Sequence, residues 1–315
     1  MFSRIPVQEF LRRQLFQAVR EDNLEKVEEL IEKGADIHSE ENYALVLAIE
    51  NCHLEIFDLL VKKGADIHTG KDKIVYLAAK NKVEFYELLL QKGVDINAHN
   101  GTALLRACVY GNLPLVKFLL EKGVCRKIDD SLYEAAFRGH LDIVKLLVRE
   151  GAKLHFSNTG RSGIISAIWK GHLDIVKFFF ESGIELHYHI DYLLGDAIVA
   201  GELEVAKFLI TSGANIHAIK QEVLHSSVMS NRFDSVCFFI QNGGDIFSSR
   251  SVLSLLIRKC SRNESGDRWK KEIRSKLLKP PGVGKGVFSS LSLLLFRLYY
   301  RPAGPAFRQA VDPTK

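Results

Sequence analysis

The chain has 315 residues, of which 47% are hydrophobic and 26% are charged. Plentiful apolar residues and charges of both signs exclude a mostly disordered chain. No run of about 18 apolar residues occurs, and the N-terminus lacks the unbroken apolar stretch of a signal peptide, so we expect no membrane-spanning helix and no secretion. The five cysteines show no CxxC spacing, which favours reduced thiols and a cytoplasmic location over a disulfide framework.

The formal net charge of +5 is unevenly distributed along the chain. Residues 250–315 carry 15 Lys and Arg against 4 Asp and Glu, whereas residues 1–249 carry 28 against 34. An acidic body with a net charge of −6 therefore precedes a basic segment with a net charge of +11. After Lys279 the composition shifts to Pro, Gly, Ser and Arg, which predicts a weakly ordered basic tail over 280–315.

An internal repeat dominates the rest of the sequence. A glycine closes each unit about every 30 residues, and these glycines are Gly34, Gly64, Gly93, Gly123, Gly151, Gly183, Gly213 and Gly243. An alanine stands sixteen residues before most of them, at Ala18, Ala48, Ala107, Ala135, Ala167 and Ala197. The third unit is one residue shorter, with Ala78, and the eighth has Ser227 instead. The phrase GHLDIVK occurs twice, from Gly139 and from Gly171, as expected of a structural module.

Each unit predicts a helix, a turn, a second helix and a loop. In the stretch that follows Gly139, the spacing places four apolar residues on one helical face, namely Leu141, Val144, Leu147 and Val148. Asp142 suits the N-terminal turn of this helix, and the trailing glycine suits a left-handed position after it. We expect a shorter first helix to end at Gly111, Gly139, Gly171 and Gly201. Alanine in that helix lets two backbones approach closely, and only stacked neighbours can bury the apolar stripe.

The stretches GHLDIVKLLVREGAK, HLEIFDLLVKKGADIH and ELEVAKFLITSGANIH resemble the second helix and exit loop of ankyrin repeats. The repeated GADIH and the period of about 30 residues further resemble the ankyrin arrays of giant DNA viruses. The resemblance implies an all-α helix-turn-helix solenoid of about eight to nine repeats over 15–260. Solenoid ends need atypical caps, so we expect an N-terminal capping segment over 1–20 and a C-terminal capping helix over 261–279.

The sequence departs from the commonest form of the family in two ways. The Thr-Pro-Leu-His opening of the first helix is absent, and Leu224-His225 alone keeps its histidine. The unit is also about three residues shorter than the usual 33, with the loss in the exit loop. This shortening argues against the projecting β-hairpin fingers of the family.

Histidines recur once per unit and do not predict a metal site. One set lies in the exit loops, at His38, His68, His155, His187 and His217, and another lies between the helices, at His53, His140 and His172. Metal ligands must converge on one ion, whereas stacked helices lie about 10 Å apart, so we interpret these histidines as hydrogen-bonding turn residues. The stretch Gly282–Gly286 lacks the glycine and hydroxyl residue of a phosphate-binding loop. We therefore expect no enzyme, cofactor, metal or small-molecule substrate.

The candidate binding residues lie at positions where the repeats differ from one another. In the ankyrin family the two residues before the glycine between the helices face the concave groove, and here they include Tyr110, Phe137, Arg138, Trp169 and Lys170. Aromatic and Arg side chains are favoured anchors at interfaces. The alternative is that Phe137 and Trp169 are partly packed between units. The exit loops add Tyr43, Lys71, Arg126, Lys127, Phe156, Arg161 and Tyr188.

These features predict a monomeric, non-catalytic scaffold or adaptor that binds a partner protein through the groove and loop tips. If the chain is viral, that partner is a host protein. The alternative is tethering to nucleic acid or an anionic surface through the basic tail, which would weaken steeply as salt rises.

Overall fold

The computed structural model describes residues 7–68, 73–80, 82–153, 162–182 and 189–245, together with Val252 and Leu255. These residues fall into two compact units, which divide between Ser166 and Ala167. All regular elements in the described ranges are helical, and no strand occurs among them. This confirms the predicted all-α class. The capping helix over 261–279 and the tail over 280–315 lie outside the described residues.

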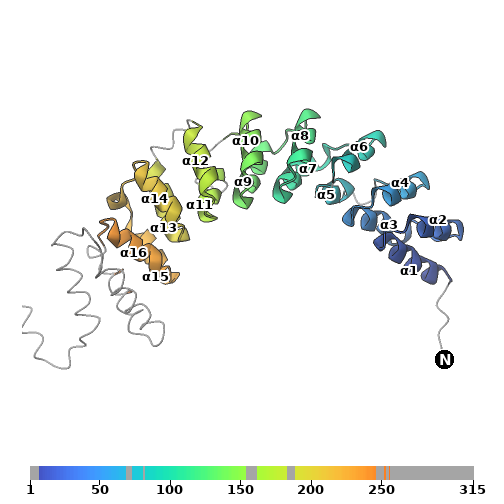
Figure 1. The fold of residues 1–315 in the computed structure, drawn as a ribbon, viewed down its shortest axis with the longest axis horizontal. Helices are drawn as coiled ribbons and strands as arrows, with labels where there is room; N and C mark the ends of the chain where they lie inside the picture. The colour runs from blue at the N-terminus through green and yellow to red at the C-terminus, as the bar shows by residue number, and fades with distance from the viewer. Residues whose placement is uncertain are drawn as a thin grey trace, which may run out of the picture. The chain divides into compact units, whose positions relative to one another are not determined.

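The first unit is built of antiparallel helix pairs, in which a first helix is followed by a second helix. The pairs are α1 (Val7–Arg20) with α2 (Leu24–Glu32), α3 (Ser39–Glu50) with α4 (Leu54–Lys62), α5 (Lys73–Ala78) with α6 (Val83–Gln91), α7 (Ala98–Tyr110) with α8 (Leu113–Glu121), and α9 (Ile128–Arg138) with α10 (Leu141–Arg149). Each first helix contacts the next first helix, and each second helix contacts the next second helix. The unit therefore has two rows of helices, which can be followed in Figure 1.

The second unit continues the same pattern. Its helices are α11 (Gly163–Trp169), which begins before the division, α12 (Leu173–Glu181), α13 (Ile190–Ala200), α14 (Leu203–Thr211), α15 (Gln221–Met229) and α16 (Phe233–Gln241), with the short 3₁₀ helix η2 (Ile216–Ala218). The first helices α13 and α15 contact each other, as do the second helices α12 and α14. Helical pairs thus extend through residue 241.

The second helices bury a narrow arc of three positions. In α10 these are Ile143, Val144 and Leu147, and α4, α6, α8, α12 and α14 bury the same three positions. The prediction was wrong for Leu141 and Val148, which are only half-buried. Successive residues of a helix are rotated by about 100°, so Val148 lies on the flank of the arc centred on Leu147.

The small residues of the first helices lie fully inside the stack. Ala18, Ala48, Ala78, Ala107, Ala135, Ala167 and Ala197 are all at most 3% exposed, and Ser227 is likewise buried. This confirms the close approach predicted at that position. A longer side chain there would push apart helices that are packed backbone to backbone.

Left-handed residues make the turn between the two helices of a pair. Gly139 has φ 84°, and the backbone N–H of the next residue, His140, donates to the carbonyl of Ala135 at 2.9 Å. Where the glycine is missing, Asp22, Cys52 and Asn231 take the same conformation with φ between 55° and 65°. Asp and Asn tolerate this region better than most residues, although each still costs free energy.

The prediction of a shorter first helix is wrong for most pairs. Helix α7 has 13 residues and α9 and α13 have 11 each, whereas each second helix has 9. The first helix is longer because it begins directly after the compact exit loop. The prediction holds for α5 and α11, with 6 and 7 residues.

Hydrogen bonds hold the exit loops close to the stack. After α10, Gly151 has φ 89°, and the N–H of Ala152 donates to the carbonyl of Leu147 at 2.9 Å, as in a Schellman motif. The N–H of Lys153 then donates to the Asp129 carboxylate at 2.7 Å, which ties the loop to the first helix of its own pair. Asp191 binds the N–H of Asn215 in the same way at 2.7 Å.

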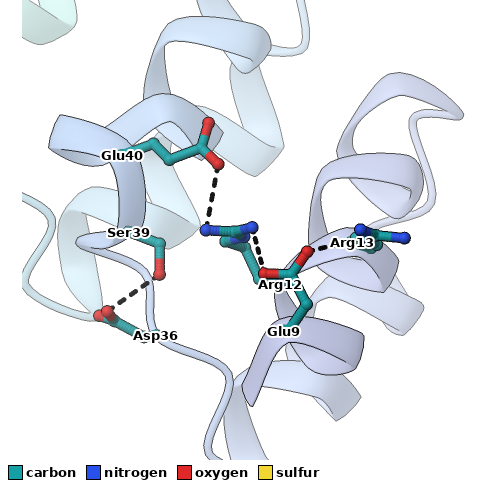
Figure 2. A network of polar contacts seen from close by, with 6 residues as sticks. All are labelled: Glu9, Arg12, Arg13, Asp36, Ser39 and Glu40. Carbon is teal, nitrogen blue, oxygen red and sulfur yellow. Dashed lines mark hydrogen bonds and ion pairs between the residues drawn. The ribbon is translucent and has the colours of Figure 1, made fainter. Parts of the chain in front are cut away.

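The junction of the first two pairs contains the most unusual backbone of the described residues. Glu40, Glu41 and Asn42, at the start of α3, all have φ between 51° and 60°, and such left-handed residues cost about 1–2 kcal/mol each. Figure 2 shows the polar network around this turn, in which Arg12 of α1 pairs with Glu40 at 3.2 Å and also binds Glu9. The hydrogen bond from Arg13, together with Arg12, lowers the pKa of Glu9. These contacts link α1 to the strained turn.

The turn glycines allow a matched test of packing between neighbouring pairs. A Cβ built on Gly111 would lie 2.6 Å from Cε1 of His140 in the next pair, whereas one built on Gly123 meets nothing within 4 Å. Both residues have positive φ, so Gly→Ala should cost about 1–2 kcal/mol at either site. Gly111→Ala should cost more because the imidazole must also move. Urea unfolding followed by circular dichroism measures the difference. Adding His140→Ala to Gly111→Ala should reduce the difference in the free energy of unfolding between the two glycine variants. Equal losses in the two single variants would contradict this packing.

The buried hydroxyl of Tyr86 gives a second stability prediction. Tyr86 is fully buried in α6, and its hydroxyl donates to the carbonyl of Val75 in α5 at 2.5 Å. Tyr86→Phe leaves that carbonyl without this partner, so we expect a loss of about 1–3 kcal/mol in the free energy of unfolding. Tyr133→Phe, at a half-buried position, should change it by less than about 0.5 kcal/mol. A neutral Tyr86→Phe variant in urea denaturation would contradict the role of this bond.

Candidate functional site

Large apolar side chains that remain exposed all lie on first helices. Among the described residues they are Val7 and Phe10 on α1, Tyr110 on α7, Trp169 on α11, Tyr192 on α13 and Met229 on α15, with exposed fractions between 45% and 73%. None of them lies on a second helix. Within each unit, the surface of the first helices, here called the first-helix face, is therefore the candidate site.

In the first unit, aromatic rings and a guanidinium gather at the C-terminal ends of α7 and α9. The Phe137 ring is half-buried and lies parallel to Tyr133, with centroids 6.2 Å apart and an interplanar angle of 19°. The Arg138 guanidinium lies over Phe137 at 5.7 Å from its centroid. Tyr110 ends α7, which packs against α9, and is 47% exposed. Phe137 is thus half-buried beside residues of its own helix, and its packing between units stays a prediction.

In the second unit, Trp169 is exposed on α11, and Asp196 is half-buried on α13. Trp169 is 45% exposed. Burial raises the pKa of Asp196, and the interaction with the Trp169 side chain opposes this shift. Tyr192 lies four residues before Asp196, so the two share one side of α13. The Lys220 ammonium lies 5.5 Å from the centroid of the Tyr192 ring.

The remaining predicted residues are placed differently from one another. Lys170 and Arg126 are exposed, and the backbone of Arg126 lies against Gly101 of α7. Tyr43 lies within α3, not in an exit loop, and its half-buried ring meets Phe16 edge-on at 5.1 Å. The loop position was wrong because α3 already begins at Ser39. Four candidates lie outside the described residues, namely Lys71, Phe156, Arg161 and Tyr188.

The sequence contained signals for residues that were missed. Met229 stands two residues before Asn231, the left-handed turn residue of the eighth pair, and so matches Trp169 before Gly171. It was missed because no glycine marks that turn. Tyr192 and Asp196 were missed because four-residue spacing on a helix places side chains together without saying that either is exposed.

The histidines take part in turns, as interpreted from the sequence. Nδ1 of His53 lies 3.0 Å from the Asp22 carboxylate in the preceding turn. Nδ1 of His38 lies 3.1 Å from the Asn42 side-chain oxygen. In the described parts of the chain there is no group of three or more His, Cys, Asp or Glu side chains placed to hold a metal ion. His155, His187 and the stretch Gly282–Gly286 lie outside those parts.

The stacked helical pairs define an α-helical repeat protein. Comparison with protein families matches residues 12–71, 69–130 and 126–190 to the family described as ankyrin repeats (3 copies). The match covers more than half of the chain, which therefore belongs to the ankyrin repeat family, whose members are generally protein–protein interaction modules. No curated protein matches the chain, so the resemblance to giant-virus arrays stays a prediction. None of the described helices has the length and apolarity needed to cross a membrane.

The carboxylate of Asp196 gives a pH-dependent stability prediction. Its pKa in the folded chain lies above the ordinary 3.8, so the charged form is disfavoured by folding. Asp196→Asn should therefore raise the free energy of unfolding at neutral pH. This gain in the free energy of unfolding should disappear as the pH falls below the pKa of Asp196 in the folded chain and then below its pKa in the unfolded chain. The carboxyl is then neutral in both states. Urea unfolding at several pH values measures it, and a destabilised variant at neutral pH would contradict the burial argument.

Proposed function

We propose that the chain is a non-catalytic scaffold that binds a partner protein through its first-helix face. The observation that carries the proposal is the restriction of exposed large apolar side chains to the first helices. Three such residues lie on the first helices of each unit, and the stack does not require them, because the second helices present none in the described ranges. Apolar and aromatic residues gathered on one surface are typical of binding sites.

Membership of the ankyrin family supports this proposal, since ankyrin repeats generally bind proteins. The aromatic and Arg residues at the ends of α7 and α9 supply further anchors of the kind that dominate interface energies. The tethering alternative rests on the net charge of +11 in residues 250–315. It differs from the scaffold in its salt dependence, because binding through Lys and Arg to phosphates weakens steeply with salt.

The test compares residues of first helices with residues of second helices. Partners are captured with the full-length chain and identified by mass spectrometry, and their affinities are measured with purified protein. Combined replacement of Tyr110 and Arg138, or of Trp169 and Met229, by alanine should lower affinity at least about tenfold, as loss of interface anchors does.

The matched controls are Lys117→Ala on α8 and Lys177→Ala on α12, which are exposed on second helices. They should leave affinity within about twofold of the original chain. Equal losses in the control variants would contradict the proposed face. Binding that survives the first-helix variants but disappears at high salt would favour the tethering alternative.

A further inference from the structure

We propose that Arg138, held over the ring of Phe137, is a subsite for a glutamate or aspartate carboxylate in a segment of the partner protein. The inference rests on the proposed scaffold function and adds the chemistry that its first unit recognises. Phe137 and Arg138 end α9, and the Tyr133 ring lies parallel to Phe137 one turn earlier. The subsite therefore lies on one first helix, within the first-helix face of the first unit.

The Phe137 ring holds the guanidinium without using its hydrogen-bonding edge. The central carbon of the guanidinium lies 5.7 Å from the ring centroid, within the range of a cation–π interaction. Phe137 is supported in turn by Tyr133, whose ring centroid lies 6.2 Å away. Stacking on a ring uses the flat face of a guanidinium, whereas a carboxylate binds two N–H groups at its edge. Arg138 can therefore bind a carboxylate while it stays on the ring, and it loses little side-chain freedom in doing so.

The guanidinium of Arg138 has not already been neutralised by the fold. Arg138 is exposed, and it forms no ion pair with a carboxylate among the described residues. Arg12 of α1 shows the opposite arrangement, because it pairs with both Glu9 and Glu40 (Figure 2). A partner carboxylate at Arg138 would thus form a new bidentate pair without breaking one inside the chain.

The charge of the surrounding helix pairs favours an acidic occupant. Residues 98–153, which contain α7 to α10, carry 9 Lys and Arg against 6 Asp and Glu, a net charge of +3. Residues 7–68, which contain α1 to α4, carry 7 against 14, a net charge of −7. The negative charge of residues 1–249 is therefore concentrated in the first two pairs. The pairs around Arg138 attract an acidic side chain instead.

Glu134 is an internal competitor at this subsite. It stands four residues before Arg138 and so shares one side of α9 with it. The two residues form no ion pair, but the negative charge of Glu134 repels an incoming carboxylate and attracts the same guanidinium. Replacement of Glu134 by glutamine is therefore expected to strengthen binding, opposite in sign to the replacement of Arg138.

The experiment uses the full-length chain, with isotope-labelled arginine, and a defined small probe. The chain is titrated with N-acetyl-glutamate methylamide while the side-chain Nε–H signal of Arg138 is followed by NMR and assigned with Arg138→Lys. N-acetyl-glutamine methylamide, which is nearly isosteric but neutral, is the matched control. We expect a saturable shift in the millimolar range with the glutamate probe and none with the glutamine probe.

Four variants give the result its sign, with the Phe137 ring signals as the readout where Arg138 itself is replaced. Arg138→Gln should weaken binding of the glutamate probe at least about tenfold, because the charge-assisted hydrogen bonds are lost. Phe137→Leu should weaken it about threefold and Phe137→Tyr should restore it, because only the latter keeps the ring that holds the guanidinium. Glu134→Gln should tighten it about threefold by removing a like charge.

The matched control variant is Arg149→Gln, which makes the same change at an exposed position on the second helix α10. It should leave the affinity for the glutamate probe within about twofold of the original chain. A variant that merely disturbed the fold would weaken binding, so tightening by Glu134→Gln is the discriminating outcome.

Two results would overturn the inference. The first is an equal shift with the glutamine probe or no saturable shift with either probe. The second is an unchanged affinity for the glutamate probe in Arg138→Gln, or an equal loss in Arg149→Gln. Loss of partner binding in the Trp169 and Met229 variant, together with either result, would leave the scaffold function intact and remove only this subsite. Retained partner binding in all first-helix variants would remove the scaffold function itself.

Discussion

Shared burial between neighbouring helix pairs is the constraint on which the rest of this chain depends. The second helices α4, α6, α8, α10, α12 and α14 have 9 residues each and bury three of them, which is too little core for an isolated hairpin. Stability therefore accumulates along the stack, where Ala107 and Ala135 allow α7 and α9 to approach closely. The turn at Gly111, closed by the His140 ring of the next pair, couples adjacent pairs at a third place.

This constraint is the reason why we place the proposed binding site on the first-helix face. The buried arcs and the left-handed glycines accept few residue types, so they repeat along the chain. The exposed positions of the first helices are free of those demands, and there the pairs present residues as different as Tyr110, Trp169 and Met229. Asp196 is a further variable residue of these helices, and its burial disfavours its own charge.

The sequence predicted what local rules determine and missed what depends on burial. Positions such as Ala135 and Gly139 could be assigned because backbone approach and positive φ leave few alternatives. Val148 was misassigned because a periodic pattern does not locate the centre of the buried arc. Tyr43 was misassigned because the start of α3 depends on the turn before it. The burial that raises the pKa of Asp196 depends on the helices around it, and no spacing along the chain encodes it.

Net charge alone would make this chain a poor discriminator among basic partners. Its body carries −6, but its own residues 250–315 carry 15 Lys and Arg, so any unspecific attraction is opposed within the same molecule. Selective recognition of a partner then has to come from side chains that differ between the pairs, such as Tyr110, Trp169 and Met229.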